Sequence, residues 1–189
     1  MTLNDIIVSA LAQLDRGHDA QSLDVWRDKL ARFANDAVLD LAEAFRLRRT
    51  ESVAHENGLF FLEALSHACL SVLSVSQNGK KLEYSFGEAG DCVYARGADA
   101  SELAVCYRFA PKSVSAPTDV PEVPEWCHGL IVTYVVGRER ASGEVNLQRG
   151  GNVYFQMYEA GKRQIRPHPG DGAAHRLVNR WGAHGAHAL

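Results

Sequence analysis

The chain has 189 residues, of which 46% are hydrophobic and 23% charged, and its net charge is −3. This composition supports a hydrophobic core and excludes bulk disorder. The negative charge excludes a general nucleic-acid binder. No apolar run reaches the roughly 18 to 20 residues that cross a bilayer, so we expect no membrane partner. The opening residues lack the basic start and cleavage site of a signal peptide, and we expect synthesis in a reducing cytosol.

Two amphipathic helices are predicted at the beginning of the chain. Thr2 and Asp5 have the spacing of a capping box, which indicates a helix start. The first helix carries one apolar stripe, made of Leu3, Ile6, Ile7, Ala10, Leu11 and Leu14. The second helix is predicted from about Ser22 to Arg48. It finishes in a basic group, made of Arg46, Arg48 and Arg49. This group either matches the negative end of the helix dipole or forms a patch that meets phosphate or an acidic partner.

The pattern changes to strands between Thr50 and Ala110. Asn57-Gly58 and Asn78-Gly79 are two-residue hairpin signals, and alternating apolar residues flank the second of them. We expect about five or six short strands in a small antiparallel β insertion over residues 50–110. The proline-rich segment 111–121 follows, and it is predicted to be an extended linker.

A second pair of helices is predicted over residues 122–166. The apolar positions of the first helix are Trp126, Leu130, Ile131, Tyr134 and Val135. Those of the second are Leu147, Val153, Tyr154, Met157, Tyr158 and Ile165, and Pro167 ends it. Helices this close in sequence should fold back as an antiparallel hairpin. Arg138, Glu139 and Arg140 are interpreted as a solvated helix face or a subunit contact, and Gly150-Gly151 as a helix start or a site of close packing.

These patterns predict an α+β protein that is mainly a bundle of about four helices. Residues 1–49 and 122–166 form the bundle, in which Ile6, Leu11, Trp26 and Leu130 share one core. Residues 50–110 form a small antiparallel β insertion between the two helix pairs. Residues 167–189 form an extended C-terminal tail. Its one apolar and aromatic cluster is made of Arg176, Leu177, Val178, Asn179, Arg180 and Trp181. A tryptophan flanked by arginines suits the anchor of a protein interface.

No motif of a known catalytic constellation is present. Cys69, Cys92, Cys106 and Cys127 include no CxxC pair, which favours ordinary thiols over a disulfide or a metal site. The tail histidines, His168, His175, His184 and His187, match no common ligand spacing. We interpret His55 and His67 as surface or loop residues. Cys127 and His128 are adjacent on a helix, so their side chains point in different directions. We therefore expect no catalytic residues, no metal and no cofactor.

The order of elements, together with three segments, resembles the head–tail connector (adaptor, or head-completion) proteins of tailed bacteriophages. The opening TLNDIIVSALAQLDRG is similar to the first helix of such adaptors. The segment DVPEVPEWCHGLIVTYVVGRERASG is similar to their third helix, and NVYFQMYEAGKRQIRP to their fourth. The resemblance extends from about Leu3 to Trp181.

This resemblance implies a structural virion protein, made in the host cytoplasm and located in the neck. It implies a ring of about twelve copies beneath the portal, joining the capsid to the tail and continuing the DNA channel. The expected partners are the portal protein, the next tail or neck component, and further copies of the chain. DNA would pass through without sequence recognition. The tail would reach onto the portal. The alternatives are another phage assembly component, a DNA-binding regulator, and an enzyme whose residues are spread over loops.

Overall fold

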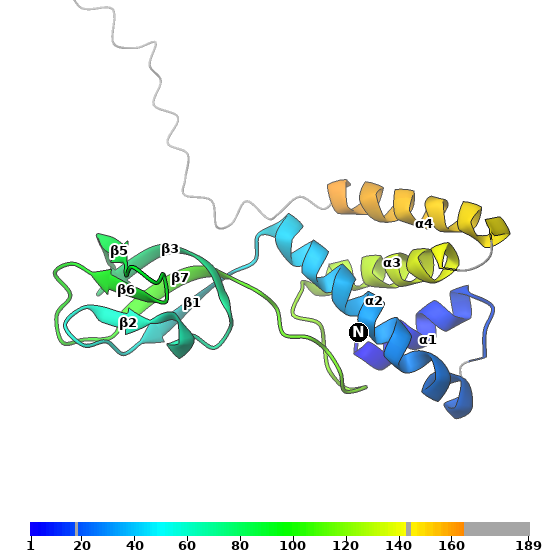
Figure 1. Ribbon diagram of the computed structural model, residues 1–189, viewed down its shortest axis with the longest axis horizontal. Helices are drawn as coiled ribbons and strands as arrows, with labels where there is room; N and C mark the ends of the chain where they lie inside the picture. Colours follow the sequence, from blue (N-terminus) through cyan, green and yellow to red (C-terminus); the bar gives the residue numbers. More distant parts are fainter. Residues whose placement is uncertain (18, 143–144, 165–189) are drawn as a thin grey trace, which may run out of the picture.

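The structure, a computed structural model, describes residues 1–17, 19–142 and 145–164. These residues form two units that lie side by side (Figure 1). The helical unit contains the four α-helices, and the β unit contains residues 48–109. The chain runs from the helical unit into the β unit and then returns to the helical unit.

The first two helices are α1 (Leu3–Gln13) and α2 (Ala20–Phe45). The predicted capping box is confirmed: the Thr2 hydroxyl accepts from Asp5 N, and Asp5 Oδ2 accepts from Thr2 N. Helix α2 ends earlier than predicted because Arg46 adopts a left-handed conformation, with φ of 52°. The chain then enters strand β1.

The β unit contains seven strands in two antiparallel sheets. The strands are β1 (Arg48–Val53), β2 (Leu59–Phe61), β3 (Cys69–Gln77), β4 (Lys80–Leu82), β5 (Tyr84–Phe86), β6 (Cys92–Ala95) and β7 (Leu103–Phe109). One sheet has the order β1-β7-β3-β4, and the other has the order β2-β6-β5. A short 3₁₀ helix, η1 (Leu62–Ala64), lies between β2 and β3. Asn78-Gly79 closes the β3–β4 hairpin as predicted, whereas Asn57-Gly58 turns into β2 while β1 pairs with β7.

Two separate cores hold these elements. The core of the helical unit includes Leu3, Ile6, Leu11, Leu30, Leu41, Ile131, Val135 and Tyr158. Ile6 and Leu11 lie in it, and Trp26 and Leu130 pack against it, so the four residues predicted to share a core do so. The core of the β unit includes Val53, Phe60, Val72, Val75, Val93, Leu103, Val105 and Tyr107, which come from both sheets.

The prediction of a mainly helical bundle with a small β insertion is wrong. The described chain is a mixed α+β protein whose β part has two sheets and a core of its own. Alternate residues of β7 are buried, which is the pattern of a strand that packs one face on a core. The sequence pattern predicted a series of short strands but did not show that they form two sheets that share one core.

The second helix pair follows a 3₁₀ turn, η2 (Glu125–Cys127), and consists of α3 (His128–Ala141) and α4 (Val145–Gln164). Trp126 lies in that turn, half-exposed, with its ring edge-on to Phe45 at 5.4 Å, so it is not part of the buried stripe of α3. Helix α4 lies on α3 and also bonds to α2, where Asp40 Oδ2 accepts from the Tyr158 hydroxyl at 2.5 Å and from Lys162 Nζ at 2.8 Å. Burial raises the pKa of Tyr158, which keeps this hydroxyl a donor.

Candidate functional site

The proline-rich segment 111–121 is fixed against the helical unit, although the sequence predicted an extended linker. The side chain of Asn35 donates to Val114 O at 2.9 Å and accepts from Val114 N at 2.8 Å. Leu3 N donates to Asp119 O at 2.8 Å. The segment is therefore fixed on the helical unit through hydrogen bonds to its backbone.

A chain of polar side chains, which we call the His67 network, joins the β unit to this segment. Ser66 N donates to Glu51 Oε2 at 2.9 Å, and the Ser66 hydroxyl also bonds to Glu51 Oε1. Ser66 Oγ lies 2.7 Å from His67 Nδ1, and His67 Nε2 lies 2.9 Å from Glu122 Oε1. The imidazole packs edge-on against the Phe109 ring at 4.9 Å. His67 lies in the loop between η1 and β3, which agrees with its interpretation as a surface or loop residue, but it is only 7% exposed.

The hydrogen atoms of the His67 network can be assigned from its acceptors. Ionised Glu122 only accepts, so His67 Nε2 carries a hydrogen. The Ser66 hydroxyl has one hydrogen, and Glu51 takes it. The Ser66 oxygen that lies beside His67 Nδ1 thus belongs to a hydroxyl that already donates to Glu51. Arg49 Nε pairs with Glu51 Oε1 at 2.7 Å.

Both carboxyl groups of the network are held in their ionised form. Burial acts to raise the pKa of Glu122, but the hydrogen bonds from His67 and from Lys112 N outweigh it and lower the pKa. Burial likewise opposes the two Ser66 hydrogen bonds at Glu51, whose pKa is also lowered. The network therefore contains two ionised carboxyl groups, those of Glu51 and Glu122. Glu122 accepts from Lys112 N of the segment that joins the two units.

Serine, histidine and glutamate are the residue types of many hydrolases, but the arrangement differs in its proton positions. A catalytic imidazole accepts the serine proton through an unprotonated nitrogen. Here the Ser66 hydroxyl donates to Glu51 Oε1. A shallow hollow of about 370 Å³ lies beside Ser66, His67 and Lys112. The geometry suits a structural tie better than an activated nucleophile.

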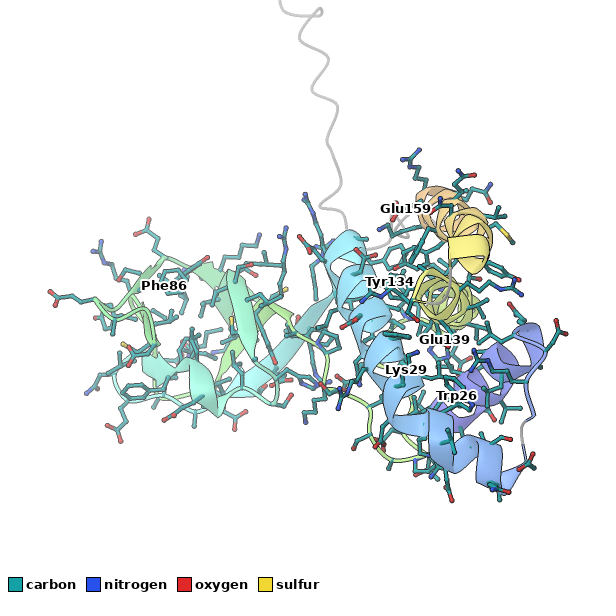
Figure 2. The ribbon with its side chains drawn as sticks, turned by 45° about the vertical axis from the view of Figure 1, so that its right-hand side comes forward. Trp26, Lys29, Phe86, Tyr134, Glu139 and Glu159 are labelled. Atoms are coloured by element: carbon teal, nitrogen blue, oxygen red, sulfur yellow. The ribbon has the colours of Figure 1, made fainter. Side chains whose placement is uncertain are left out.

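The predicted charged face of α3 is divided between the interior and the surface. Glu139 is only 5% exposed, so its interpretation as a solvated or subunit-contact charge is wrong. Its Oε1 lies 3.0 Å from Arg16 Nη2, and its Oε2 lies 2.6 Å from Lys29 Nζ. Figure 2 shows Lys29 of α2 and Glu139 of α3 facing one another inside the helical unit. This carboxylate holds α2, α3 and the loop after α1 together.

The two arginines of the same face lie nearer the surface. Arg138 is exposed, with its guanidinium 5.3 Å from the Phe33 ring centroid and 3.9 Å from Asp36. Arg140 is half-buried and donates to Gln13 O at 3.3 Å. Of the predicted group, Arg138 is the residue that remains accessible to a neighbouring chain.

The basic group after α2 does not lie on one helix end. Arg46 caps α2, whereas Arg48 and Arg49 belong to strand β1, opposite Arg108 and Tyr107 of β7. The prediction of a common helix terminus is wrong because the left-handed turn at Arg46 ends the helix before Arg48. All three residues are exposed, and they lie where the two units meet.

An apolar hollow lies at this meeting point, and we call it the junction groove. Its volume is about 470 Å³, and the end of α2, the start of β3 and the end of β7 line it. Arg46 and Arg108 are among its lining residues. Local sequence patterns do not indicate this groove, because segments far apart in the chain form its walls.

The predicted tail cluster, Arg176, Leu177, Val178, Asn179, Arg180 and Trp181, lies outside the described residues. The same holds for His168, His175, His184 and His187. Gly151 packs closely on α3, as predicted for Gly150-Gly151, since a Cβ there would lie 3.0 Å from Ala141 N.

The thiols and histidines of the described chain form no reactive pair. The four cysteines are free, and burial raises the pKa of Cys127 to about 11, so this thiol is protonated near neutral pH. His128 Nδ1 lies 2.8 Å from the amino group of Met1, and its Nε2 lies 3.1 Å from Val123 O. Within the described ranges, no group of three or more His, Cys, Asp or Glu residues is placed to hold a metal ion.

No protein-family model matches the chain, and no curated protein matches it either. Among the residues that the structure describes, none of the helices combines the length and hydropathy that a membrane crossing requires.

Proposed function

We propose that the protein is a structural subunit of the head–tail connector of a tailed bacteriophage. In this proposal, about twelve copies form a ring beneath the portal and continue the DNA channel, and a tail or neck component binds the other side. The resemblance of the helical segments supports the family, and the surface of the described chain supports assembly with other chains.

The observation that carries the proposal is the amount of large apolar side chain left at the surface of both units. Leu39 and Leu70 lie at the junction, and Phe61 and Tyr94 lie on the three-stranded sheet. On the outer side of α4, Val153 and Met157 are more than half exposed. Apolar exposure over several faces is typical of a subunit that is buried on more than one side in an assembly.

The fixed relation of the two units also supports a ring. Closed rings need each subunit to present two surfaces at a constant angle. The Asn35–Val114 and His67–Glu122 hydrogen bonds restrain that angle in the isolated chain.

The test is assembly with portal-bearing capsids. Purified protein should bind them, and electron microscopy should show added ring density below the portal. The tail is tested separately by truncation after Pro167 and by Trp181→Ala, because a buried tryptophan at a hot spot contributes about 2 kcal/mol or more. Both variants should keep the helical circular dichroism signal and lose capsid binding. Binding equal to that of the parent would remove the tail from the proposal.

A hydrolase is the second candidate, because Ser66, His67 and Glu122 lie in hydrogen-bonding sequence. We propose instead that the protein is not an enzyme, since the Ser66 proton is directed to Glu51. Hydrolysis of short-chain nitrophenyl esters, DNA and ATP should remain at background. Ester hydrolysis that is lost on Ser66→Ala would favour the hydrolase.

A DNA-binding regulator and another assembly component remain the alternatives from the sequence. The net charge of −3 disfavours the regulator, since duplex binding depends on phosphate neutralisation. Binding of a mixed-sequence duplex at 50 mM salt would favour the regulator. Binding to capsids that lack a portal would favour another assembly component.

A further inference from the structure

The junction groove is apolar in its walls and open at its rim. Leu47 and Phe109 lie along it, and Leu39 and Leu70 beside it are 54% and 66% exposed. Aliphatic side chains this exposed on both sides of a concave surface lose contact with water when a partner fills the groove. The groove therefore suits an occupant that presents large apolar side chains.

The charged residues of the junction groove indicate the charge of the surface that would bind there. Arg46 is exposed at one side, and Arg108 lines the groove with its Nε buried and without a hydrogen-bond partner. A buried N–H group normally has an acceptor. Glu43 is the single carboxylate among the lining residues, against these two guanidinium groups. The occupant should bring carboxylates beside its apolar side chains.

A surface of that description lies on the three-stranded sheet, and we call it the tip patch. Leu59 of β2 pairs directly with Tyr94 of β6, and Phe61 lies on the same side of β2 as Leu59. These three side chains are between 38% and 48% exposed. Glu56 and Glu63, both exposed, line the same hollow as Leu59 and Phe61. The tip patch thus has an apolar centre and an acidic edge.

The apolar centre of the tip patch lies away from the junction groove of the same copy, whereas Glu63 also lines a hollow with Ala110 and Pro111, which border that groove. The groove lies where the β unit meets α2, whereas β2, β5 and β6 lie at the far end of the β unit (Figure 1). Figure 2 likewise places Phe86 of β5 at the end remote from the helices.

We propose that the tip patch of one copy docks in the junction groove of a second copy. The acidic edge, Glu56 and Glu63, then faces Arg46 and Arg108, and Phe61 and Tyr94 cover Leu39 and Leu70. The contact is heterologous, so repetition gives a ring or an open filament. This inference rests on the proposed function, because it names the surfaces through which copies of the connector meet.

The experiment uses two charge reversals in the full chain, Glu63→Arg and Arg46→Glu. Sedimentation velocity from about 1 µM to 1 mM should show that the parent self-associates, more weakly at high salt. Each variant alone should need at least about a tenfold higher concentration, because like charges then meet at every contact. An equimolar mixture should recover the association of the parent, since each variant supplies the surface that fits the other.

Two matched controls carry the same changes of net charge away from both surfaces. Asp28→Arg and Arg32→Glu are exposed positions on α2 and should associate as the parent does. Circular dichroism and melting curves should show that all four variants are folded.

Three results would overturn the inference: a parent that is monomeric throughout this range, variants that associate like the parent, or a mixture that fails to recover.

Binding to portal-bearing capsids separates this result from the proposed function. Variants that form rings on capsids like the parent would refute the groove contact and leave the connector standing. Recovery in the mixture, with no binding to capsids, would support the groove contact and refute the connector. If an acidic segment of another protein displaces the second copy from the parent, and the mixture of variants does not recover association, the groove is assigned to that protein.

Discussion

Glu139 shows how one buried charge can organise a helical unit. Both of its carboxylate oxygens bind cations of the same chain, Arg16 and Lys29, and the Arg16 guanidinium also lies 3.7 Å from the centroid of the Trp26 ring. A buried carboxylate is tolerated when such partners satisfy it. The local sequence Arg138-Glu139-Arg140 is typical of a solvated face. The partner Lys29 is more than a hundred residues away in the chain, and nothing in the local sequence indicates it.

We predict that Glu139→Ala lowers the free energy of unfolding by about 2–4 kcal/mol, because two cations lose their counter-charge in a half-buried site. Urea denaturation followed by circular dichroism measures the change. Glu159→Ala is the control, since Glu159 is half-exposed and its pair with Lys162 lies at the surface. Its cost should stay within about 1 kcal/mol. Equal costs for the two variants would contradict the assigned role of Glu139.

The lowered pKa of Glu122 leads to a second prediction, which concerns the free energy of unfolding at acidic pH. A carboxyl group whose pKa is lower in the folded chain stabilises the fold above its unfolded pKa, and this contribution is lost as pH falls through the folded pKa. The parent should therefore exceed Glu122→Gln in unfolding free energy at pH 5.5, and the two should converge below the unfolded value near 4.5. Urea curves at half-unit intervals of pH measure this. Glu102→Gln, at an exposed position, controls for the loss of one carboxyl group, and a loss at pH 5.5 equal to that of Glu122→Gln would contradict the role of Glu122.

At the scale of elements, the contact between α3 and α4 depends on small residues. A Cβ at Gly151 would lie 3.0 Å from Ala141 N and 3.1 Å from Gly137 O, and a Cβ at Gly137 would lie 3.2 Å from Tyr154 Cβ. The two backbones therefore approach closely at this level. Further along the pair, Tyr134 packs edge-on against Phe155 and Tyr158. Small residues set the distance at one end and aromatic rings fill the space at the other.

We predict that Gly151→Val destabilises the protein by about 1–3 kcal/mol, because the added atoms force the two helices apart. Gly129→Ala is the matched control, since a Cβ there meets nothing within 4 Å and alanine favours the helix. Thermal melting should show a lower Tm for the first variant and an equal or higher Tm for the second. A Gly151→Val protein as stable as the parent would show that α4 is not held at this distance.

The turns of the β unit give a matched pair of their own. Gly58 and Gly79 both have positive φ, 87° and 77°. A Cβ at Gly58 would lie 2.3 Å from Ala95 O, whereas one at Gly79 would meet nothing within 4 Å. We predict a loss of about 1 kcal/mol for Gly79→Ala, from the backbone conformation alone, and about 3 kcal/mol for Gly58→Ala. Chemical denaturation of both variants measures the difference, and equal losses would exclude the close approach of β6.

The elements were more predictable than their partners. Thr2 and Asp5 indicated the start of α1, and Asn78-Gly79 indicated its hairpin, because caps and tight turns depend on neighbouring residues. The pairing of β1 with β7 joins residues that are at least fifty positions apart, and local periodicity does not encode it. The burial of His67 was not predicted for the same reason, since it depends on Glu122 and Phe109.

At the scale of the molecule, the β unit is connected to the helical unit through two neighbouring strands, β1 and β7. Arg48 at the start of β1 pairs with Arg108 near the end of β7, so the chain enters and leaves the unit at adjacent positions. A unit attached in this way, with a core of its own, can be removed without stretching the rest of the chain. The groove and the network described above both lie at this attachment.

We predict that replacement of residues 48–109 by a short glycine–serine linker leaves a folded helical unit. Its core residues all lie outside the deleted range, so cooperative melting of the helical circular dichroism signal should persist. Stability should decrease, because the bond between His67 and Glu122 is lost. Non-cooperative melting would show that the two units form one folding unit.

The position of the β unit between the helix pairs also sets an order of events during synthesis. Helices α1 and α2 leave the ribosome first, but α3, on which they pack, begins at His128, after the whole β unit. Synthesis adds about 5–20 residues per second, so the apolar stripes of α1 and α2 remain without α3 for on the order of ten seconds. Within this interval the β unit has all of its strands and can complete its core. The earliest helices are thus the last part of the chain to be covered, and they are the segments of the nascent protein that a chaperone would bind.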